Sequence, residues 1–454
     1  MKVVIVGAGK VGFHIASRLT LENKDVVVVD CNIEALRRVS DNLDVQTVSG
    51  LGTSPVVLEE AGIKGAEILL AVTDSDEANL VACLLTDNIS PFTKKLARIR
   101  DADFDNFHDM LCNNAPHIDT VINPEIEVVK TINDLMSVPG AVDVGDFADG
   151  RIKFVGVYLD KSCVLAGARL LDLPGLIGDN RPLIAAVVRD EELIIPRGKD
   201  YLQPHDLVYF ISEEAKLLQT LSIFDKHTEP VHRVLIIGGG QIGYRLAKLL
   251  EGRNTQCKLI EKRAERCSYL AEQLNKTIVL HGDGSDQNLL SEENIGDIDV
   301  VVTLTDDEEI NIVASLLTKR MGACKVITKI SKFSYLPLMS AIGIEQVVSP
   351  RLSAINTILQ HIRRGKVLSA ISIKGEQAEV LEAVALETSD IVSKPLKKVS
   401  FPKGAMLAGV TRKEKIIIPT GDTIVEPEDH IIIFARREAV PGVEKLLAVK
   451  LEYF

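Results

Sequence analysis

Two segments of this 454-residue chain carry the same glycine-rich pattern, VVIVGAGKVG from Val3 to Gly12 and VLIIGGGQIG from Val234 to Gly243. Each follows a short aliphatic run and opens an amphipathic stretch, and an acid, Asp30 or Glu261, ends the next aliphatic run. A glycine loop between strand and helix, followed by such an acid, is typical of a mononucleotide-binding βαβ unit. The repeat therefore limits the chain to folds that hold two copies of one plan.

Further pairs of segments extend the repeat. GLGTS (50–54) matches GDGSD (282–286), and AVTDSDEAN (71–79) matches TLTDDEEIN (303–311). Outside these segments, VVRDEELIIPRGKDYLQPHDLVYF (187–210) resembles VTRKEKIIIPTGDTIVEPEDHIII (410–433). Each half therefore contains a large module and a small one.

The large modules alternate Val/Ile runs with amphipathic stretches, which predicts a parallel sheet with crossover helices. We predict an α/β fold with two tandem Rossmann-like, doubly wound parallel sheets, each followed by a small α+β domain. In the first copy the strands are expected near 2–6, 25–30, 44–48, 67–72, 95–100 and 118–122. The predicted domains are residues 1–140, 141–225, 231–366 and 367–454.

Two helix starts are expected between the large and small modules. Asn123 and Ser349 each precede a proline, which places a capping residue before a proline at the first helical position. These helices would link each large module to its small one. The small modules show strand-like alternation and turn signals, such as Pro196 and Gly198.

Composition excludes several classes of protein. The chain has no run of roughly 18 apolar residues, so it lacks the signal of a membrane helix. Its N-terminus is typical of a buried first strand rather than of a signal peptide. Seven cysteines without a C-x-x-C pair favour reduced thiols and a cytoplasmic location. A net charge of -12 and an aromatic content of 4% argue against nucleic acid as a partner.

The glycine loops predict a phosphate site in each half. In the first loop, Gly7 allows a sharp turn, Gly9 lets a phosphate approach the backbone, and Gly12 lets the helix pack on the strand. The helix N-terminus attracts the anion. The following acid would accept hydrogen bonds from ribose hydroxyls and disfavour a 2'-phosphate, so NAD is expected over NADP. Nearby basic residues leave the choice between NAD and NADP open; they are Arg37, Arg38, Lys262 and Arg263. A separate alternative is that one or both loops fold and bind nothing.

Other polar residues are expected near the same crevices. Thr73-Asp74 and Thr305-Asp306 end the fourth strands, where they either border the nucleotide or cap a helix. Arg98 and Lys329 lie in fifth-strand patterns, where a cation either contacts phosphate or extends from an edge into solvent.

Two metal-site patterns are weak. The run from Asp101 to Cys112 begins like a calcium loop, but Asn106 stands where the turn needs glycine and Cys112 where a glutamate should close the site. His108, Cys112 and His117 fit no common zinc spacing. No metal site is therefore predicted.

A dehydrogenase is the rival to a regulatory nucleotide-binding protein. Hydride transfer needs a proton-transferring group beside the nicotinamide and a substrate domain. The small modules span only about 80 residues each, and no histidine of one half recurs in the other: His205 aligns with Glu428. The residues therefore favour a protein that binds nucleotides without turnover, with an NAD-dependent oxidoreductase as the alternative.

The whole chain resembles the TrkA family, the cytoplasmic subunit of bacterial and archaeal Trk potassium uptake. The resemblance rests on the order large, small, large, small, with VVIVGAGKVG, Asp30, AVTDSDEAN and ARIR in the first half and VLIIGGGQIG, Glu261, GDGSD and TLTDDEEIN in the second. In that family the large modules are RCK (or KTN) nucleotide-binding domains. The resemblance implies a homotetrameric ring, peripheral on the inner face of the membrane, that gates a Trk-type potassium-translocating subunit.

The resemblance also implies the residues that line each site. Two positions depart from the family or the repeat: Leu51 stands opposite Asp283, which puts a polar adenosine contact in doubt, and Lys329 replaces an arginine. The implied ligand is NAD or NADH, with ATP or ADP as alternatives. The implied site residues are Gly7, Gly9, Lys10, Val11, Gly12, Asp30, Thr73 and Arg98 in the first half, and Gly238, Gly240, Gln241, Ile242, Gly243, Glu261, Asp283 and Thr305 in the second.

Overall fold

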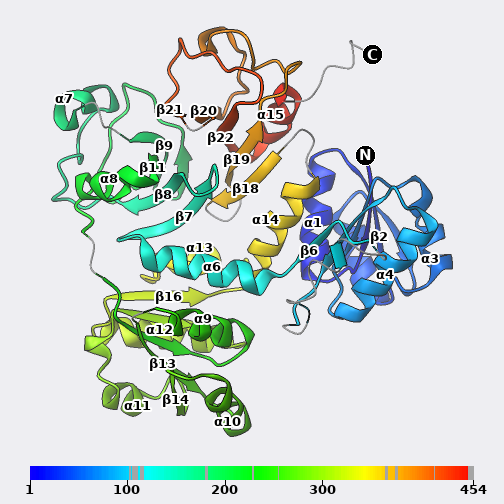
Figure 1. Ribbon diagram of the computed structural model, residues 1–454, viewed down its shortest axis with the longest axis horizontal. Helices are drawn as coiled ribbons and strands as arrows, with labels where there is room; N and C mark the ends of the chain where they lie inside the picture. Colours follow the sequence, from blue (N-terminus) through cyan, green and yellow to red (C-terminus); the bar gives the residue numbers. More distant parts are fainter. Residues whose placement is uncertain are drawn as a thin grey trace. The chain divides into compact units, whose positions relative to one another are not determined.

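The structure is a computed structural model that describes residues 1–101, 104, 111–112, 117–178, 182–227, 230–253, 255–362, 367–373, 377–413 and 415–447 (Figure 1). The chain divides into two compact units. The first comprises Met1–Glu127 with Pro350–Ile362, and the second comprises Val128–Ser349 with Arg363–Phe454.

The first unit is built on a six-stranded, all-parallel sheet in the order β3-β2-β1-β4-β5-β6 (Figure 1, blue to cyan). The order reverses between β1 and β4, which is the switch point of a doubly wound sheet. Valine and isoleucine runs fill the central strands, which are buried on both faces by helices. The elements are β1 (Lys2–Val6), α1 (Lys10–Leu21), β2 (Asp25–Asp30), α2 (Ile33–Asn42), β3 (Gln46–Ser49), α3 (Pro55–Glu60), β4 (Ile68–Ala71), α4 (Asp76–Ile89), β5 (Lys94–Arg98) and β6 (Thr120–Ile122).

The second unit contains a parallel sheet of the same plan, in the order β14-β13-β12-β15-β16-β17. The predicted fold class and its duplication are therefore confirmed. The elements are β12 (Arg233–Ile237), α9 (Gln241–Glu251), β13 (Gln256–Glu261), α10 (Ala264–Gln273), β14 (Ile278–His281), α11 (Gln287–Glu292), β15 (Val300–Thr303), α12 (Glu308–Arg320), β16 (Lys325–Lys329), α13 (Leu336–Ala341) and β17 (Gln346–Val348).

The helix that follows each parallel sheet packs on the sheet of the other half. α14 (Pro350–Ile362) follows β17 in the sequence but contacts α1 and β6 in the first unit. α6 (Pro124–Ser137) follows β6, and its residues from Val128 onward share a core with α9 and β12 in the second unit. The chain thus exchanges one helix in each direction.

The two expected helix caps differ. The Asn123 side chain accepts hydrogen bonds from the backbone amides of Glu125 at 3.1 Å and Ile126 at 3.4 Å, which confirms the first cap. α14 (Pro350–Ile362) begins at the predicted proline, which confirms the second helix start, but the buried Ser349 hydroxyl has no hydrogen-bond partner within the described ranges and so makes no capping hydrogen bond. Ser349 directly follows β17 and is 7% exposed, and its hydroxyl accepts no hydrogen bond from the first amides of α14.

The two small modules, both in the second unit, are five-stranded antiparallel sheets with one topology. Read from the same edge, their strand orders are β7-β8-β11-β9-β10 and β18-β19-β22-β20-β21, and the strands correspond one to one. Each has a matching bidentate ion pair, Arg189 with Asp206 at 2.7 Å and Arg412 with Asp429 at 2.8 Å. The elements are β7 (Ala141–Phe147), β8 (Ile152–Tyr158), α7 (Leu173–Ile177), β9 (Leu183–Arg189), β10 (Glu192–Ile194), β11 (Leu207–Glu213), α8 (Leu217–Ile223), β18 (Val367–Ile373), β19 (Ala378–Val384), β20 (Ala405–Arg412), β21 (Lys415–Ile417), β22 (His430–Arg436) and α15 (Val440–Leu447).

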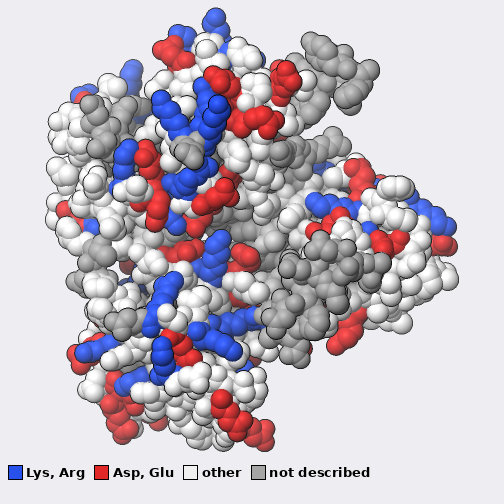
Figure 2. Space-filling model, in the orientation of Figure 1, with Lys and Arg blue, Asp and Glu red and all other residues white. Residues whose placement is uncertain are grey.

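In the part of the chain that the structure describes, no helix combines the length and apolarity that a bilayer span requires. On the face shown in Figure 2, basic and acidic side chains are interspersed and form no broad surface of a single sign.

Candidate nucleotide crevices

The first crevice opens where β1 meets α1. Gly7 has a φ of +115°, and a Cβ added there would lie 3.0 Å from the Thr73 backbone nitrogen. A Cβ at Gly12 would lie 1.8 Å from the Gly7 carbonyl oxygen, so the helix can start this close to the strand only with glycine at that position. A Cβ at Gly9, by contrast, would meet no atom within 4 Å. Gly9 therefore faces the open space that a phosphate needs.

The N-terminus of α1 is available to an anion. Gly9 is its N-cap and provides no side chain to satisfy the first-turn amides, and the first turn carries no acidic residue. The early amides of a helix have no intrahelical acceptor, and the helix dipole adds a partial positive charge there. The second copy repeats this geometry, with a φ of +111° at Gly238, an uncapped N-cap at Gly240 and close packing at Gly243.

The acid that ends each second strand contacts its glycine loop. Asp30 accepts a hydrogen bond from the Ala8 amide at 2.6 Å and one from the Asn32 amide at 2.8 Å. Glu261 likewise accepts from the amides of Gly239 and Arg263, each at 2.9 Å. The carboxylates are thus fixed at the crevice edge, and each oxygen keeps a lone pair for a further donor such as a ribose hydroxyl.

The Glu261 carboxylate is ionised despite its burial. Only 7% of the residue is exposed, and burial alone would raise its pKa. The amide hydrogen bonds from Arg263 and Gly239 and the charge of Arg263 outweigh burial, so the pKa lies below its ordinary value.

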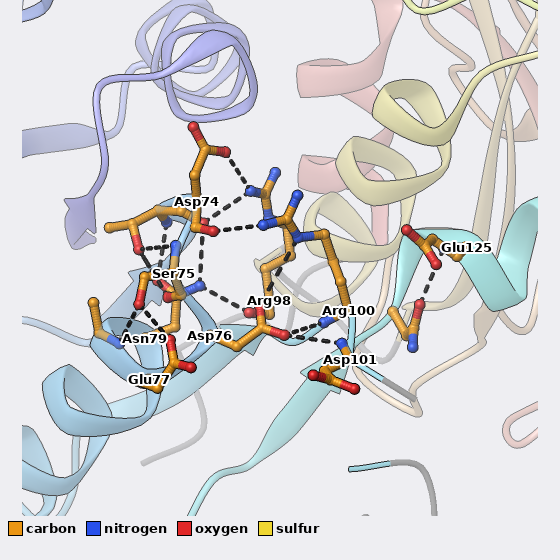
Figure 3. Close-up of polar contacts among 12 residues, drawn as sticks. Asp74, Ser75, Asp76, Glu77, Asn79, Arg98, Arg100, Asp101 and Glu125 are labelled. Carbon is orange, nitrogen blue, oxygen red and sulfur yellow. Dashed lines mark hydrogen bonds and ion pairs between the residues drawn. The ribbon is translucent and has the colours of Figure 1, made fainter. Parts of the chain in front are cut away.

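A buried asparagine holds the end of each fourth strand. The Asn79 side chain is fully buried; its oxygen accepts from the Thr73 amide at 2.9 Å and the Thr73 hydroxyl at 2.8 Å. Its nitrogen donates to the carbonyl oxygens of Arg98 at 2.8 Å and Thr73 at 3.2 Å, which joins α4 to β4 and β5 (Figure 3). Asn311 makes the same four contacts with Thr305 and Lys329.

Neither asparagine was among the site residues predicted from the sequence. Asn79 and Asn311 end the matched segments AVTDSDEAN and TLTDDEEIN, and the repeat of an asparagine in the first turn of both helices was the available signal.

The predicted phosphate cations are engaged by acids. Arg98 donates from Nη2 to the Thr73 carbonyl oxygen and to Asp74 Oδ1, both at 2.8 Å (Figure 3). Burial lowers the pKa of the Arg98 guanidinium, which is 7% exposed. Lys329 donates to Asp306 Oδ1 at 3.2 Å. A phosphate would therefore have to replace Asp74 or Asp306 as the partner of the cation.

The crevices form cavities of about 440 Å³ in the first half and about 320 Å³ in the second. The predicted residues divide into those on the lining and those outside it. Those on the lining are Gly7, Gly9, Asp30, Thr73, Gly238, Gly240, Glu261, Asp283 and Thr305. Those outside the lining are Lys10, Val11, Gly12, Arg98, Gln241, Ile242 and Gly243.

The two linings differ at one matched position. Leu51 lies on the first lining and is 60% exposed. At the matching position Asp283 pairs with Lys262 at 2.9 Å and accepts from the Ser285 hydroxyl at 2.6 Å. The Ser285 hydrogen bond and then Lys262 lower the pKa of Asp283 to about 2. The second crevice is therefore more polar on this side than the first, where Arg38 is the lining cation.

The weak metal patterns gain no support from the described residues. Most of the run from Asp101 to Cys112, including Asn106 and His108, lies outside them. Among the residues that are described, no three potential metal ligands cluster. All seven cysteines are free thiols, as expected.

Comparison with known proteins decides the family. Residues 3–124 and 234–350 match the TrkA-N domain family, and residues 380–448 match the TrkA-C domain family. The chain is 38% identical over 458 residues to the Trk system potassium uptake protein TrkA of Azorhizobium caulinodans and 36% identical over 458 residues to that of Halomonas elongata; each comparison covers 100% of both chains. The chain belongs to the TrkA family. This membership confirms the resemblance and, with it, the predicted role in Trk potassium uptake.

Solved structures support the fold of this TrkA family member. The GsuK RCK domain aligns with a TM-score of 0.61 at 17% identity, covering 98% of this chain and 94% of that one. The structure described as the GsuK channel bound to NAD aligns with a TM-score of 0.60 at 16% identity, covering 98% of this chain and 78% of that one. At this identity the likeness establishes the RCK fold.

Proposed function

We propose that this chain binds a dinucleotide, NAD or NADH, in each of its two crevices and that occupancy regulates potassium flux through a Trk-type membrane subunit. The observation that carries the proposal is the duplicated open glycine position: Gly9 and Gly240 face free space at uncapped helix N-termini, each beside a fixed acid. A pyrophosphate fits the first feature and a ribose diol fits the second.

Several facts support the choice of ligand. Asp30 and Glu261 line the crevices at the ends of the second strands, where an acid accepts hydrogen bonds from a ribose diol and would repel a 2'-phosphate, which favours NAD over NADP. GsuK, whose fold this chain shares, has been solved bound to NAD. ATP and ADP present the same adenosine and phosphate groups, so they are the alternative ligands for either crevice.

A regulatory role fits the linings better than hydride transfer. Among the described residues that line the crevices there is no histidine or tyrosine to exchange a proton with a substrate. The curated relatives are Trk system potassium uptake proteins. We propose that the chain acts as a homo-oligomer, a tetrameric ring with eight large modules, on the cytoplasmic face of the membrane subunit.

The ligand acts only through its differential affinity for two states of the ring. The test is potassium flux into vesicles that carry a Trk-type membrane subunit, with and without this chain and with NAD, NADH, ATP or ADP. Flux should depend on the added chain and respond to at least one nucleotide. Asp30→Ala and Glu261→Ala should shift the nucleotide concentration that gives half the response.

Two results would contradict the proposal. The first is a chain that binds the membrane subunit while flux ignores every nucleotide. The second is steady oxidation of NADH by the purified chain with 2-oxo acids or imines, which would instead support the oxidoreductase.

A further inference from the structure

The fifth strand of each parallel sheet begins and ends with a cation. β5 runs from Lys94 to Arg98, and β16 runs from Lys325 to Lys329. The cation at the end of each strand contacts the crevice, since Arg98 and Lys329 donate to Asp74 and Asp306. These acids lie on the crevice linings.

The lysine at the start of each strand holds the helix contributed by the other half. In the first unit, Lys94 Nζ donates to the His361 carbonyl oxygen of α14 at 3.1 Å. In the second unit, Lys325 Nζ donates to the carbonyl oxygen of Leu135, near the end of α6. It also donates, at 3.4 Å, to the carbonyl oxygen of Val138, the residue after the helix. The two anchors occupy matched positions of the repeat.

The chemistry of these contacts is that of a helix C-terminus. The last carbonyl groups of a helix lack intrahelical donors and carry partial negative charge, so an ammonium group satisfies and stabilises them. Within the described ranges, neither Lys94 nor Lys325 forms an ion pair with a carboxylate. The helix carbonyl oxygens are therefore the hydrogen-bond acceptors of both amines.

The strand between the two cations is short and stiff. Its five extended residues span about 13 Å from first to last, and the residues between the ends of β5 are buried within the sheet. A displacement at the crevice end is therefore transmitted to the anchor end without being absorbed by a loop.

The end of α6 also has room to move. A cavity of about 290 Å³ borders it, and its lining includes Met136, Ser137, Gly140 and Lys325. Burial at this place lowers the pKa of the Lys325 amine to about 8, because desolvation disfavours its charged form.

We infer that β5 and β16 couple the crevices to the exchanged helices, with Lys94 and Lys325 as positioning residues that hold α14 and α6. A nucleotide phosphate that replaces Asp74 or Asp306 as the partner of Arg98 or Lys329 changes the position of the strand. The shift in turn changes the hydrogen bond from the lysine at the start of the strand to the end of the helix. The inference rests on the proposed nucleotide binding. Along the sequence α6 leads to β7 and α14 leads to β18, so each anchor acts on the segment that enters a small module.

The experiment measures amide hydrogen exchange of α6 and α14 in the full-length chain with and without saturating NAD and NADH. In the wild type, the last turns of both helices should change their exchange rate on binding. Lys325→Met should raise the exchange rate of the α6 end in the free protein by about two- to fivefold, the contribution of a cation at a helix C-terminus. It should also remove the nucleotide response of that end. Lys94→Met should do the same to α14, and the arginine variants should restore both.

Affinity supplies a readout that a merely structural anchor would not move. Nucleotide binding and the anchoring of the helix end are thermodynamically linked. The factor by which the nucleotide changes the equilibrium between the anchored and released helix end must therefore also appear in the Kd of the nucleotide. In a Gly9→Asp background, which leaves the second crevice to titrate, Lys325→Met should shift Kd by that factor. Lys319→Met is the matched control, because Lys319 also donates to a carbonyl oxygen, that of Gly343 at 2.8 Å, but to none on an exchanged helix.

The outcomes separate the two proposals. If nucleotide binds while the amide hydrogens of α6 and α14 exchange at the same rate with and without it, the coupling is overturned and nucleotide binding stands. An equal effect of Lys319→Met also overturns the coupling. If neither crevice binds any of the nucleotides, the proposed function fails and the coupling fails with it, whatever the helices do in the free protein.

Discussion

Arg98 Nη2 lies 2.8 Å from Asp74 Oδ1 at the carboxyl edge of the first parallel sheet (Figure 3). The guanidinium is 9% exposed and the carboxylate 95% exposed, so the acid alone faces solvent. The pair therefore lies at the edge of the first crevice, with Asp74 on its lining and Arg98 outside it. A nucleotide that uses Arg98 must compete with Asp74.

Removing that competition should strengthen binding. Asp74→Asn keeps the shape of the side chain but ends the ion pair, and we expect the Kd of the first crevice to fall by about two- to fivefold, the range of a partly exposed salt bridge. Asp306→Asn should act in the same direction on the second crevice. Isothermal titration with NADH at two salt concentrations measures both effects.

Glu77→Gln is the control for Asp74→Asn. Glu77 is an exposed acid in the first turn of α4 that hydrogen-bonds Ser75 and does not contact Arg98. An equal gain in affinity from both variants would mean that net charge, rather than release of Arg98, strengthens binding.

Each glycine loop should account for one binding event. Gly9→Asp places a carboxylate in the open space at the N-cap of α1, where it repels a phosphate. The backbone φ of -65° suits aspartate, and aspartate is at least as good an N-cap as glycine, so the fold should be retained. Titration should lose one of two sites per chain, and Gly240→Asp should lose the other.

Gly65→Asp is the matched control for the loop variants. A Cβ at Gly65 also meets no atom within 4 Å, and this glycine lies in a short 3-10 helix outside the crevice lining. It should keep the full stoichiometry. A Gly9→Asp variant that also kept it would show that the first loop binds nothing.

The buried asparagines should matter for stability more than any charged residue of the crevice. Asn79→Ala leaves the Thr73 amide and the Arg98 carbonyl oxygen without their partner, and we expect a loss of about 2–4 kcal/mol in unfolding free energy. Asn311→Ala should have a similar cost in the second half. Thermal unfolding of the full-length chain, followed by calorimetry, resolves which transition shifts.

Asn88→Ala is the control on the same helix. The Asn88 side chain is exposed on α4 and donates only to the Leu84 carbonyl oxygen, so its loss should cost less than about 0.5 kcal/mol. A similar shift for Asn79 and Asn88 would contradict the role assigned to the buried contacts.

The sequence was sufficient for the sheets and the loops because their signals are local. Aliphatic runs predicted all six strands of the first sheet to within about two residues, and the glycine spacing located Gly9 and Gly240 at open positions. Whether those positions bind nucleotide stays a prediction, as do the domain boundaries.

What the sequence could not show depends on long-range packing. The apolar face of α14 indicates that the helix is buried, but nothing in its residues says that it packs on the first sheet rather than on its own. Lys94 and Lys325 read as polar residues at strand starts, and their partners lie in helices of the other half. The Arg98 pair with Asp74 likewise required the register of β4 and β5.

The stability of the chain should rise with pH because of Lys325. Burial lowers the pKa of this amine from 10.5 to about 8 in the folded chain, whereas the unfolded chain keeps the ordinary value. Between these two values the unfolded state binds more protons, so this group makes folding more favourable as the pH rises from 8 to 10.5. The full cost of burying the charge is present below pH 8. The change over the whole window is about 3 kcal/mol, at 1.36 kcal/mol per pKa unit.

Urea unfolding of the wild type and of Lys325→Met at pH 7.5, 8.5 and 9.5 measures this contribution as a difference, which cancels the titration of tyrosines and other lysines. Methionine retains the bulk of the side chain without a charge, so the variant should lose most of the rise. Lys319→Met, which removes an exposed lysine from the neighbouring helix α12, gives the background difference to subtract. A stability difference between the wild type and the variant that stayed constant across the three pH values would show that the Lys325 amine remains charged throughout, held by the carbonyl oxygens of Leu135 and Val138 more strongly than burial disfavours it.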